Sequence, residues 1–148
     1  MSKRIETRFI PDGDLITVIA WVKGRNGRMP GRFVLDTGAA MTTIAPRMIR
    51  KLGYGGGDRL RTTKVRSALG EERGYTVRVE SLSALHVRVR NLEVNVFDLG
   101  YDDYEGLLGM NFLNALYYDV RFAEQRLLVQ PAMVDLDASS ANESSRPS

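Results

Sequence analysis

Short apolar runs separated by turn-forming residues make up most of the sequence, and this pattern limits the fold more than any other feature. Residues 15–22 form a continuous run rich in Ile and Val, which is typical of a strand buried on both faces. Asn26 and Gly27 follow, and they favour a tight hairpin because both residues tolerate positive φ angles. We therefore expect residues 32–35 to return antiparallel to the first run.

The remaining runs also predict strands, with two short helices between them. Strands are expected at residues 85–89, 92–97 and 107–108, in a long polar hairpin over residues 60–80, and in a final hairpin made by residues 117–122 and 126–129. Short helices are expected at residues 46–52, where Pro46 suits a first turn and Gly53 a stop, and at residues 109–115. Many short strands and little helix predict an all-β fold that closes into a β-barrel.

Length and composition predict one globular domain. The 148 residues allow a single core, which we assign to residues 1–134, and the polar residues 135–148 are expected to form a disordered tail. The chain is 43% hydrophobic and 26% charged, as soluble globular proteins are. No apolar run is long enough for a membrane span and no secretory signal is visible, so we expect a cytoplasmic protein. Whether a longer natural chain carries a membrane anchor stays open.

Composition also removes several classes of function. There is no cysteine, so disulfides and thiolate metal sites are excluded, and His86 is the sole histidine. The net charge of +3 is mild, and the basic residues within 59–66 are typical of a solvated strand face. The acidic segment 98–105 lacks the alternating oxygen ligands of a calcium loop. We expect no metal, no other cofactor and no nucleic-acid partner.

One apolar run leads directly into a carboxylate. Residues 33–35 are Phe, Val and Leu, and Asp36, Thr37, Gly38 and Ala39 follow without a break. A carboxylate at the end of a buried strand is costly unless it is hydrogen-bonded or functional. The alternative is an Asp that begins a turn and accepts hydrogen bonds from its own loop. Asp-Thr-Gly by itself favours that simpler interpretation.

The wider context changes this interpretation, because four features occur in a fixed order. Residues 33–39 read Phe-Val-Leu-Asp-Thr-Gly-Ala, and residues 105–113 read Glu-Gly-Leu-Leu-Gly-Met-Asn-Phe-Leu about seventy positions downstream. A polar hairpin with Gly70 near its tip lies between them, and the final hairpin follows. This order resembles the retropepsin family, the single-domain aspartic proteases of retroviruses and their cellular and bacterial relatives. The resemblance covers residues 15–129.

The resemblance implies an aspartic endopeptidase of the acid-protease fold that works as a homodimer. Hydrolysis by this route needs two adjacent carboxylates that share one proton, one acting as base toward water and the other as acid toward the scissile carbonyl. The chain contains a single Asp-Thr-Gly, so the second carboxylate would be Asp36 of another copy. The implied partners are this second copy and a peptide or protein substrate. The route uses no metal and no covalent intermediate.

Roles for further residues follow from the same resemblance. Thr37 would hydrogen-bond across the dimer, and Gly38 would let the backbone approach the substrate and the other loop. Ala39 stands where pepsin-like enzymes carry Ser, so one hydrogen bond to the carboxylates is missing. Met110 and Asn111 stand where retroviral enzymes often carry Arg and then Asn or Asp. The flap tip that would close over bound peptide consists of Ala68, Leu69 and Gly70, and the residues that would pack beneath the catalytic loop are Leu107, Leu108 and Gly109.

Two other functions remain open at this point. A catalytically silent, dimeric peptide-binding module would share the fold and Asp36, and a peptidase assay separates it from the enzyme. A basic β-barrel that binds nucleic acid would make Asp-Thr-Gly a coincidence, and it predicts a monomer with strongly salt-dependent binding.

Overall fold

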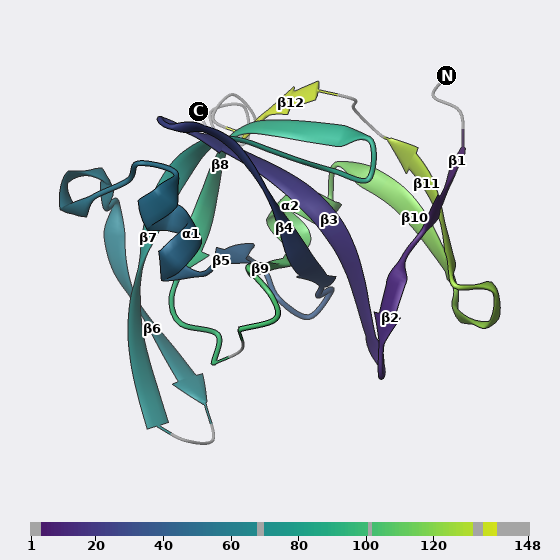
Figure 1. Cartoon of the computed structure of the whole chain (residues 1–148), viewed down its shortest axis with the longest axis horizontal. Coiled ribbons are helices and arrows are strands. Elements are labelled where there is room, and N and C mark those ends of the chain that lie inside the picture. The colour runs from purple at the N-terminus through teal and green to yellow at the C-terminus, as the bar shows by residue number, and fades with distance from the viewer. Residues whose placement is uncertain (1–3, 68–69, 101, 132–134, 139–148) are drawn as a thin grey trace, which may run out of the picture.

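The computed structural model describes residues 4–67, 70–100, 102–131 and 135–138 (Figure 1). The strands are β1 (Ile5–Arg8), β2 (Ile10–Asp12), β3 (Leu15–Gly24), β4 (Gly27–Leu35), β5 (Thr43–Ile44), β6 (Arg61–Ser67), β7 (Gly70–Ala84), β8 (Val87–Val96), β9 (Gly106–Leu108), β10 (Leu116–Arg121), β11 (Arg126–Pro131) and β12 (Asp135–Asp137). The helices are α1 (Pro46–Lys51) and α2 (Met110–Leu113), with single 3₁₀ turns η1 (Gly56–Asp58) and η2 (Phe122–Glu124). The predicted all-β class is confirmed.

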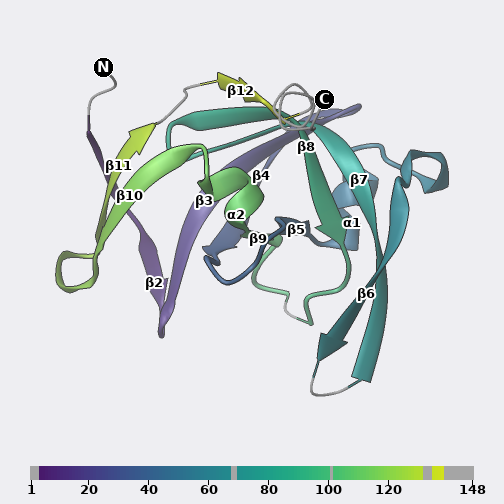
Figure 2. The same ribbon diagram turned by 180° about the vertical axis from the view of Figure 1, so that it is seen from behind.

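The strands form two sheets. The smaller sheet has the order β1-β11-β10, and the larger one has the order β12-β8-β5-β9-β4-β3-β7-β6, with β2 paired to β3. Figure 2 shows the smaller sheet beside the larger one, with β2 leading from β1 into β3. Strand β7 also pairs with β8, so the larger sheet curls back on itself, but β6 and β12 stay at its edges. The expected closed barrel is therefore not formally reached.

The hairpin of β3 and β4 agrees with the sequence pattern in its pairing but not in its burial. The two strands pair antiparallel from Thr17↔Val34 to Gly24↔Gly27, and Gly27 adopts a φ of 106°. The expectation that both faces of β3 are buried is wrong, because Ile19 and Trp21 are 48% and 40% exposed. Alternate residues of β3 point into the core and toward solvent, as in an antiparallel sheet that is covered on one face.

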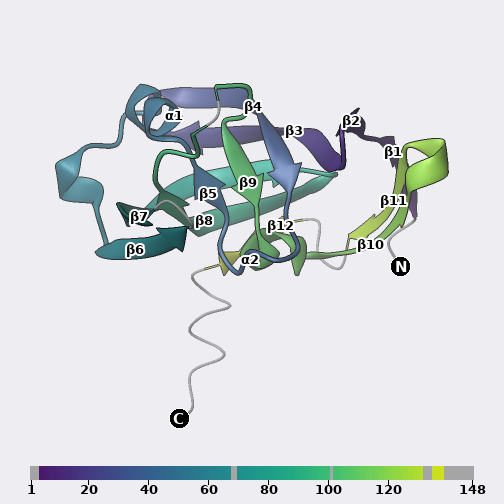
Figure 3. The same cartoon turned by 90° about the horizontal axis from the view of Figure 1, so that it is seen from below.

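Strand β9 lies between β4 and β5, as Figure 3 shows. It runs parallel to β4, with Leu35 paired to Leu108, and antiparallel to β5. Strand β5 follows β4 directly in the chain, so the connection between them has to pass the end of β9. We call this connection, residues 36–42, the catalytic loop, after the role that the resemblance predicts for Asp36. The topology therefore places Asp36 at the carboxyl end of a strand inside the sheet.

Both expected helices are present. Helix α1 begins at Pro46, and Arg50 and Lys51 lie in its last turn, where positive charge is favourable. Helix α2 is shorter than the predicted span 109–115, and its Phe112 and Leu113 are buried. Within the described residues, no helix combines the length and the apolar character that crossing a membrane requires. The largest fully buried side chains of the core include Phe33, Phe112, Ile44, Met48, Ile49, Leu52, Leu82, Leu92, Leu108, Leu113 and Leu127.

The start of the expected disordered tail is a strand. Residues 135–137 form β12, which pairs parallel with β8 through Leu136↔Val89. Leu136 and Ala138 are partly buried and pack against the core, so two apolar side chains provide the anchor that the polar composition hides. Residues 139–148 lie outside the described residues. The division into residues 1–134 and 135–148 stays a prediction.

We predict that Gly106→Ala lowers the free energy of unfolding by about 2 kcal/mol, because overpacking a tight contact typically costs that much. A Cβ at this position would lie 2.3 Å from the carbonyl oxygen of Thr43 and 2.4 Å from the ring of Phe33. Urea unfolding measures the change. Gly57→Ala is the matched control, because a Cβ at Gly57 meets nothing within 4 Å. Equal stability of the two variants would show that β9 can move away from β4 and β5.

Candidate active site

Asp36 is the first residue after β4. Its backbone N–H donates to the carbonyl oxygen of Leu108 at 2.9 Å, which extends the ladder between β4 and β9 by one residue. Its side chain is partly exposed, and Oδ1 accepts a hydrogen bond of 3.1 Å from the N–H of Gly38. The N–H of Ala39 donates to the Asp36 carbonyl oxygen at 3.2 Å. Backbone groups therefore fix the carboxylate while part of its surface stays accessible.

Helix α2 holds the catalytic loop from the other side. The N–H of Met110 donates to the carbonyl oxygen of Ala39 at 2.8 Å, and the N–H of Asn111 donates to that of Ala40 at 3.0 Å. The N–H groups in the first turn of a helix have no partner within the helix. Here the first two of these N–H groups donate hydrogen bonds to carbonyl oxygens of the catalytic loop. The shape of the loop and the start of α2 therefore depend on each other.

A buried polar pair completes this support. Asn111 Oδ1 accepts hydrogen bonds of 2.8 Å from both the N–H and the hydroxyl of Thr42, which is fully buried. The Thr42 Oγ1 in turn accepts a hydrogen bond of 3.1 Å from the N–H of Gly109. The amide group of Asn111 donates to the carbonyl oxygen of Glu93 on β8 at 2.8 Å. Buried polar groups that satisfy one another in this way rigidify the structure around them.

Thr42 was missed by the sequence analysis. Its signal is weak, since a Thr that follows a loop is ordinarily read as a turn residue or as the start of a strand. Asn111 was noted only by its position in the second motif. Their partnership joins residues 69 positions apart, which a local sequence pattern does not reveal.

The structure brings the second motif against the catalytic loop. Leu108 is fully buried in the core, and its carbonyl oxygen accepts the hydrogen bond from Asp36. Leu107 is half-buried on the opposite face of β9. Gly109 fits closely, since a Cβ there would lie 2.5 Å from the carbonyl group of Met41. Leu108 and Gly109 thus lie against the loop, whereas Leu107 pairs with Val34 on β4 and Thr43 on β5. Their role in supporting the loop stays a prediction.

The other candidate residues are those at the tip of the catalytic loop and in the predicted flap. Thr37 and Gly38 are exposed. The predicted long hairpin is present as β6 and β7, and Gly70 pairs with Ser67 at its end. Ala68 and Leu69 lie outside the described residues. Figure 1 shows that this hairpin and the connection from β8 to β9 extend from the same side of the molecule.

The acidic segment before β9 is braced by contacts on both sides. The side chain of Tyr104 is buried, and its hydroxyl donates to a carboxylate oxygen of Asp12. This hydrogen bond to Asp12, together with burial, raises the pKa of Tyr104. Arg47 Nη2 donates to the carbonyl oxygen of Tyr104 at 2.6 Å. In the part of the chain that the structure describes, no group of three or more His, Cys, Asp or Glu side chains could hold a metal ion.

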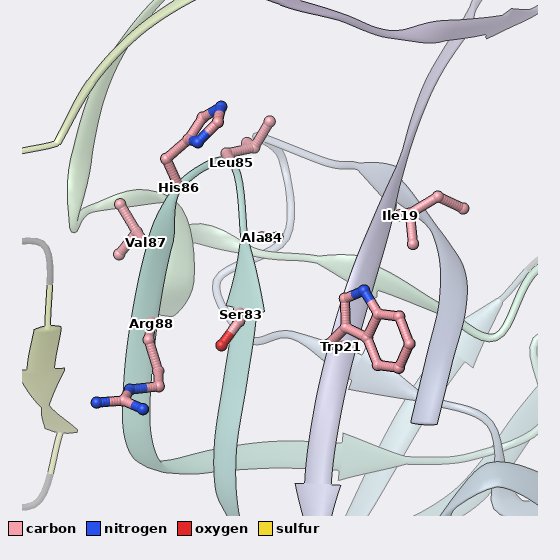
Figure 4. Close-up of a pocket in the computed structure, with 8 residues that line it drawn as sticks. All are labelled: Ile19, Trp21, Ser83, Ala84, Leu85, His86, Val87 and Arg88. Carbon is pink, nitrogen blue, oxygen red and sulfur yellow. The ribbon is translucent and has the colours of Figure 1, made fainter. Parts of the chain in front are cut away.

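A separate hollow lies on the outer face of the sheet (Figure 4). It has a volume of about 460 Å³ and is lined by Ile19, Trp21, Ser83, Ala84, Leu85, His86, Val87 and Arg88. No residue of the catalytic loop lines it. His86 Nε2 lies 3.1 Å from the Thr7 hydroxyl, so this histidine joins the turn between β7 and β8 to β1.

Solved structures share the fold, including the following two. A retropepsin-like aspartic protease from Rickettsia conorii matches with a TM-score of 0.66 and 20% sequence identity, over 88% of this chain and 94% of that chain. The EIAV protease, solved in complex with the inhibitor HBY-793, matches with a TM-score of 0.51 and 19% identity, over 71% of this chain and 90% of that chain. No curated protein sequence matches the chain.

A family model described as "gag-polyprotein putative aspartyl protease" matches residues 24–115. The matched region contains Asp36, the catalytic loop, the hairpin of β6 and β7, and the second motif with α2. It spans more than half of the chain. The chain therefore belongs to the retropepsin-like aspartyl protease family.

Proposed function

We propose that this protein is an aspartic endopeptidase that works as a homodimer, with one Asp36 contributed by each copy. The position of Asp36 carries the proposal. It is a partly exposed carboxylate at the end of a core strand, fixed by backbone hydrogen bonds at Leu108 and Gly38. An Asp that merely begins a turn would account for the Gly38 contact. It would not account for a loop braced by β9, by α2 and by the buried pair of Thr42 and Asn111.

The proposed chemistry uses two Asp36 carboxylates that share one proton. Like charges a few ångströms apart cannot both ionise easily, so one member of the pair stays protonated. The ionised member takes a proton from water as the water oxygen attacks the scissile carbonyl carbon, and the protonated member donates to the carbonyl oxygen. The amide nitrogen then takes a proton as the C–N bond breaks.

The requirement for a second copy follows from the single Asp-Thr-Gly of the chain. A two-fold axis between the two Asp36 side chains would bring the catalytic loops together. Thr37 and Gly38 are exposed, which leaves them available to meet the loop of the second copy. In this arrangement Thr37 would hydrogen-bond across the dimer, and the backbone at Gly38 would approach the substrate.

The hairpin of β6 and β7 would act as the flap over a bound peptide. Its tip, residues 68–70, would close on the substrate and exclude water during the reaction. The substrate class is then a peptide or protein segment in an extended conformation that lies between the flap and the catalytic loops.

Asp36→Asn should reduce peptidase kcat by about 10³-fold or more while the protein stays folded and dimeric, because the change is isosteric but removes the shared proton. Cleavage of a peptide library measures activity, and sedimentation measures the dimer. Asp98→Asn is the matched control, since Asp98 Oδ1 accepts a hydrogen bond of 2.9 Å from Gly100 N–H in the same local geometry. Near wild-type turnover of Asp36→Asn would refute the assignment. Peptide binding without cleavage by the wild type would favour a silent binding module.

Mixing experiments test the shared site. When equal amounts of wild type and Asp36→Asn exchange subunits freely, about a quarter of the dimers carry two Asp36 residues. Activity should therefore fall to about a quarter of that of wild type at the same total concentration. A fall to one half would show that each chain acts alone. Specific activity of the wild type should also decrease on dilution through the dimer dissociation constant.

A further inference from the structure

The strand pairing defines the point at which the flap separates from the rest of the sheet. Strands β6 and β7 pair with each other from Arg61↔Thr76 to Ser67↔Gly70. Strand β7 pairs with β8 only from Tyr75 onward, where Tyr75 lies opposite Val96. Among the strands that the structure describes, none pairs with the hairpin beyond this point. An isolated two-stranded hairpin is at best marginally stable. The row of residues at Thr76 is therefore the base of the flap.

An ion pair spans this base. Thr76 lies between Arg61 on β6 and Asn95 on β8, and Glu93 lies two residues before Asn95. The guanidinium of Arg61 pairs with the carboxylate of Glu93, so the contact reaches from the outer strand of the flap across β7 to β8. The ion pair thus links β6 directly to β8, the strand that pairs with β7 at the base of the flap.

The two partners differ in their exposure to solvent. The Arg61 side chain is 62% exposed, whereas that of Glu93 is 15% exposed. The hydroxyl groups of Thr63 and Thr76 and the Oε1 atom of Glu93 are buried, and none of the three has a hydrogen-bond partner in the described part of the chain. The ion pair with Arg61 is the contact that Glu93 Oε1 makes instead. A charge that is mostly buried needs its partner, because water cannot replace the lost interaction. Arg61 can therefore be largely hydrated by itself, whereas Glu93 depends more on its ion pair.

Glu93 is also tied to the catalytic loop. Its carbonyl oxygen accepts the hydrogen bond from Asn111, and Asn111 holds Thr42 and, through it, Gly109. A continuous set of contacts therefore runs from β6 through Glu93 to the loop that carries Asp36. The side chain of Glu93 contacts Arg61 of the flap, and its backbone carbonyl supports the catalytic loop through Asn111.

We propose that Glu93 is a positioning residue that fixes the base of the flap relative to the catalytic loop. This inference rests on the proposed peptidase function for its kinetic consequences. Its physical consequence, restraint of β6 through Arg61, does not depend on activity. Glu93 acts through Arg61, so it should influence how substrate is held more than the chemical step at Asp36.

The test compares Glu93→Gln with Arg61→Gln. Glu93→Gln removes the charge, keeps the side-chain shape and leaves the backbone contact to Asn111 intact. It should raise KM about fivefold with little change in kcat, and it should speed amide hydrogen exchange at residues 61–65. Arg61→Gln should have the larger effect on both KM and exchange, because it leaves the mostly buried carboxylate of Glu93 without its charged partner. The KM and the exchange rates of the double variant should be closer to those of Glu93→Gln than to those of Arg61→Gln. The KM and the exchange rates of Arg61→Lys should be close to those of the wild type.

Glu6→Gln is the control, since it breaks an ion pair between Arg126 and Glu6 that joins β1 to β11, away from the flap. It should leave KM and the exchange of β6 unchanged. Wild-type KM and exchange in Glu93→Gln, or a smaller effect of Arg61→Gln than of Glu93→Gln, would overturn the inference. Exchange is measured in the Asp36→Asn background as well. Loss of the peptidase assignment would leave that readout intact, so the two failures are distinguishable.

Discussion

The parallel pairing of β4 with β9 is the contact on which the rest of the structure depends. The two strands are about seventy residues apart in the chain, and α1, the hairpin of β6 and β7, and β8 all belong to the connection between them. A parallel pair requires a long crossover, and here about half of the chain, residues 36–105, serves as that crossover. Because β9 lies between β4 and β5, the chain is forced to loop past its end. That loop carries Asp36.

Local signals were sufficient for most of the elements. The apolar run before Asn26 and Gly27 predicted the hairpin of β3 and β4, and Pro46 marked the start of α1. The Leu-Leu-Gly of the second motif was noted through the resemblance to the retropepsin family, whereas Asp36 stood out because an apolar strand leads into it and turn-forming residues follow. These signals work because they depend on neighbours a few positions away in the chain.

The features that were missed all depend on residues distant in sequence. The apolar residue of β12 that packs against the core, Leu136, carries no periodic pattern of its own. The outward face of β3 could not be distinguished from the inward one, because both carry apolar side chains. Thr42 and Asn111 form their contact only after β9 has been placed between β4 and β5. Polar networks of this kind are set by topology, which sequence periodicity does not encode.

The pairing of β1 with β11 has a consequence for how the protein is made. Glu6 on β1 contacts Arg126 on β11, and these residues are 120 positions apart. Closing so long a loop is costly in chain entropy, and contacts of this range slow folding. During synthesis β1 emerges first but has to wait unpaired until β11 follows it. The three-stranded sheet therefore cannot assemble until β11 has been synthesised, after every other described strand except β12.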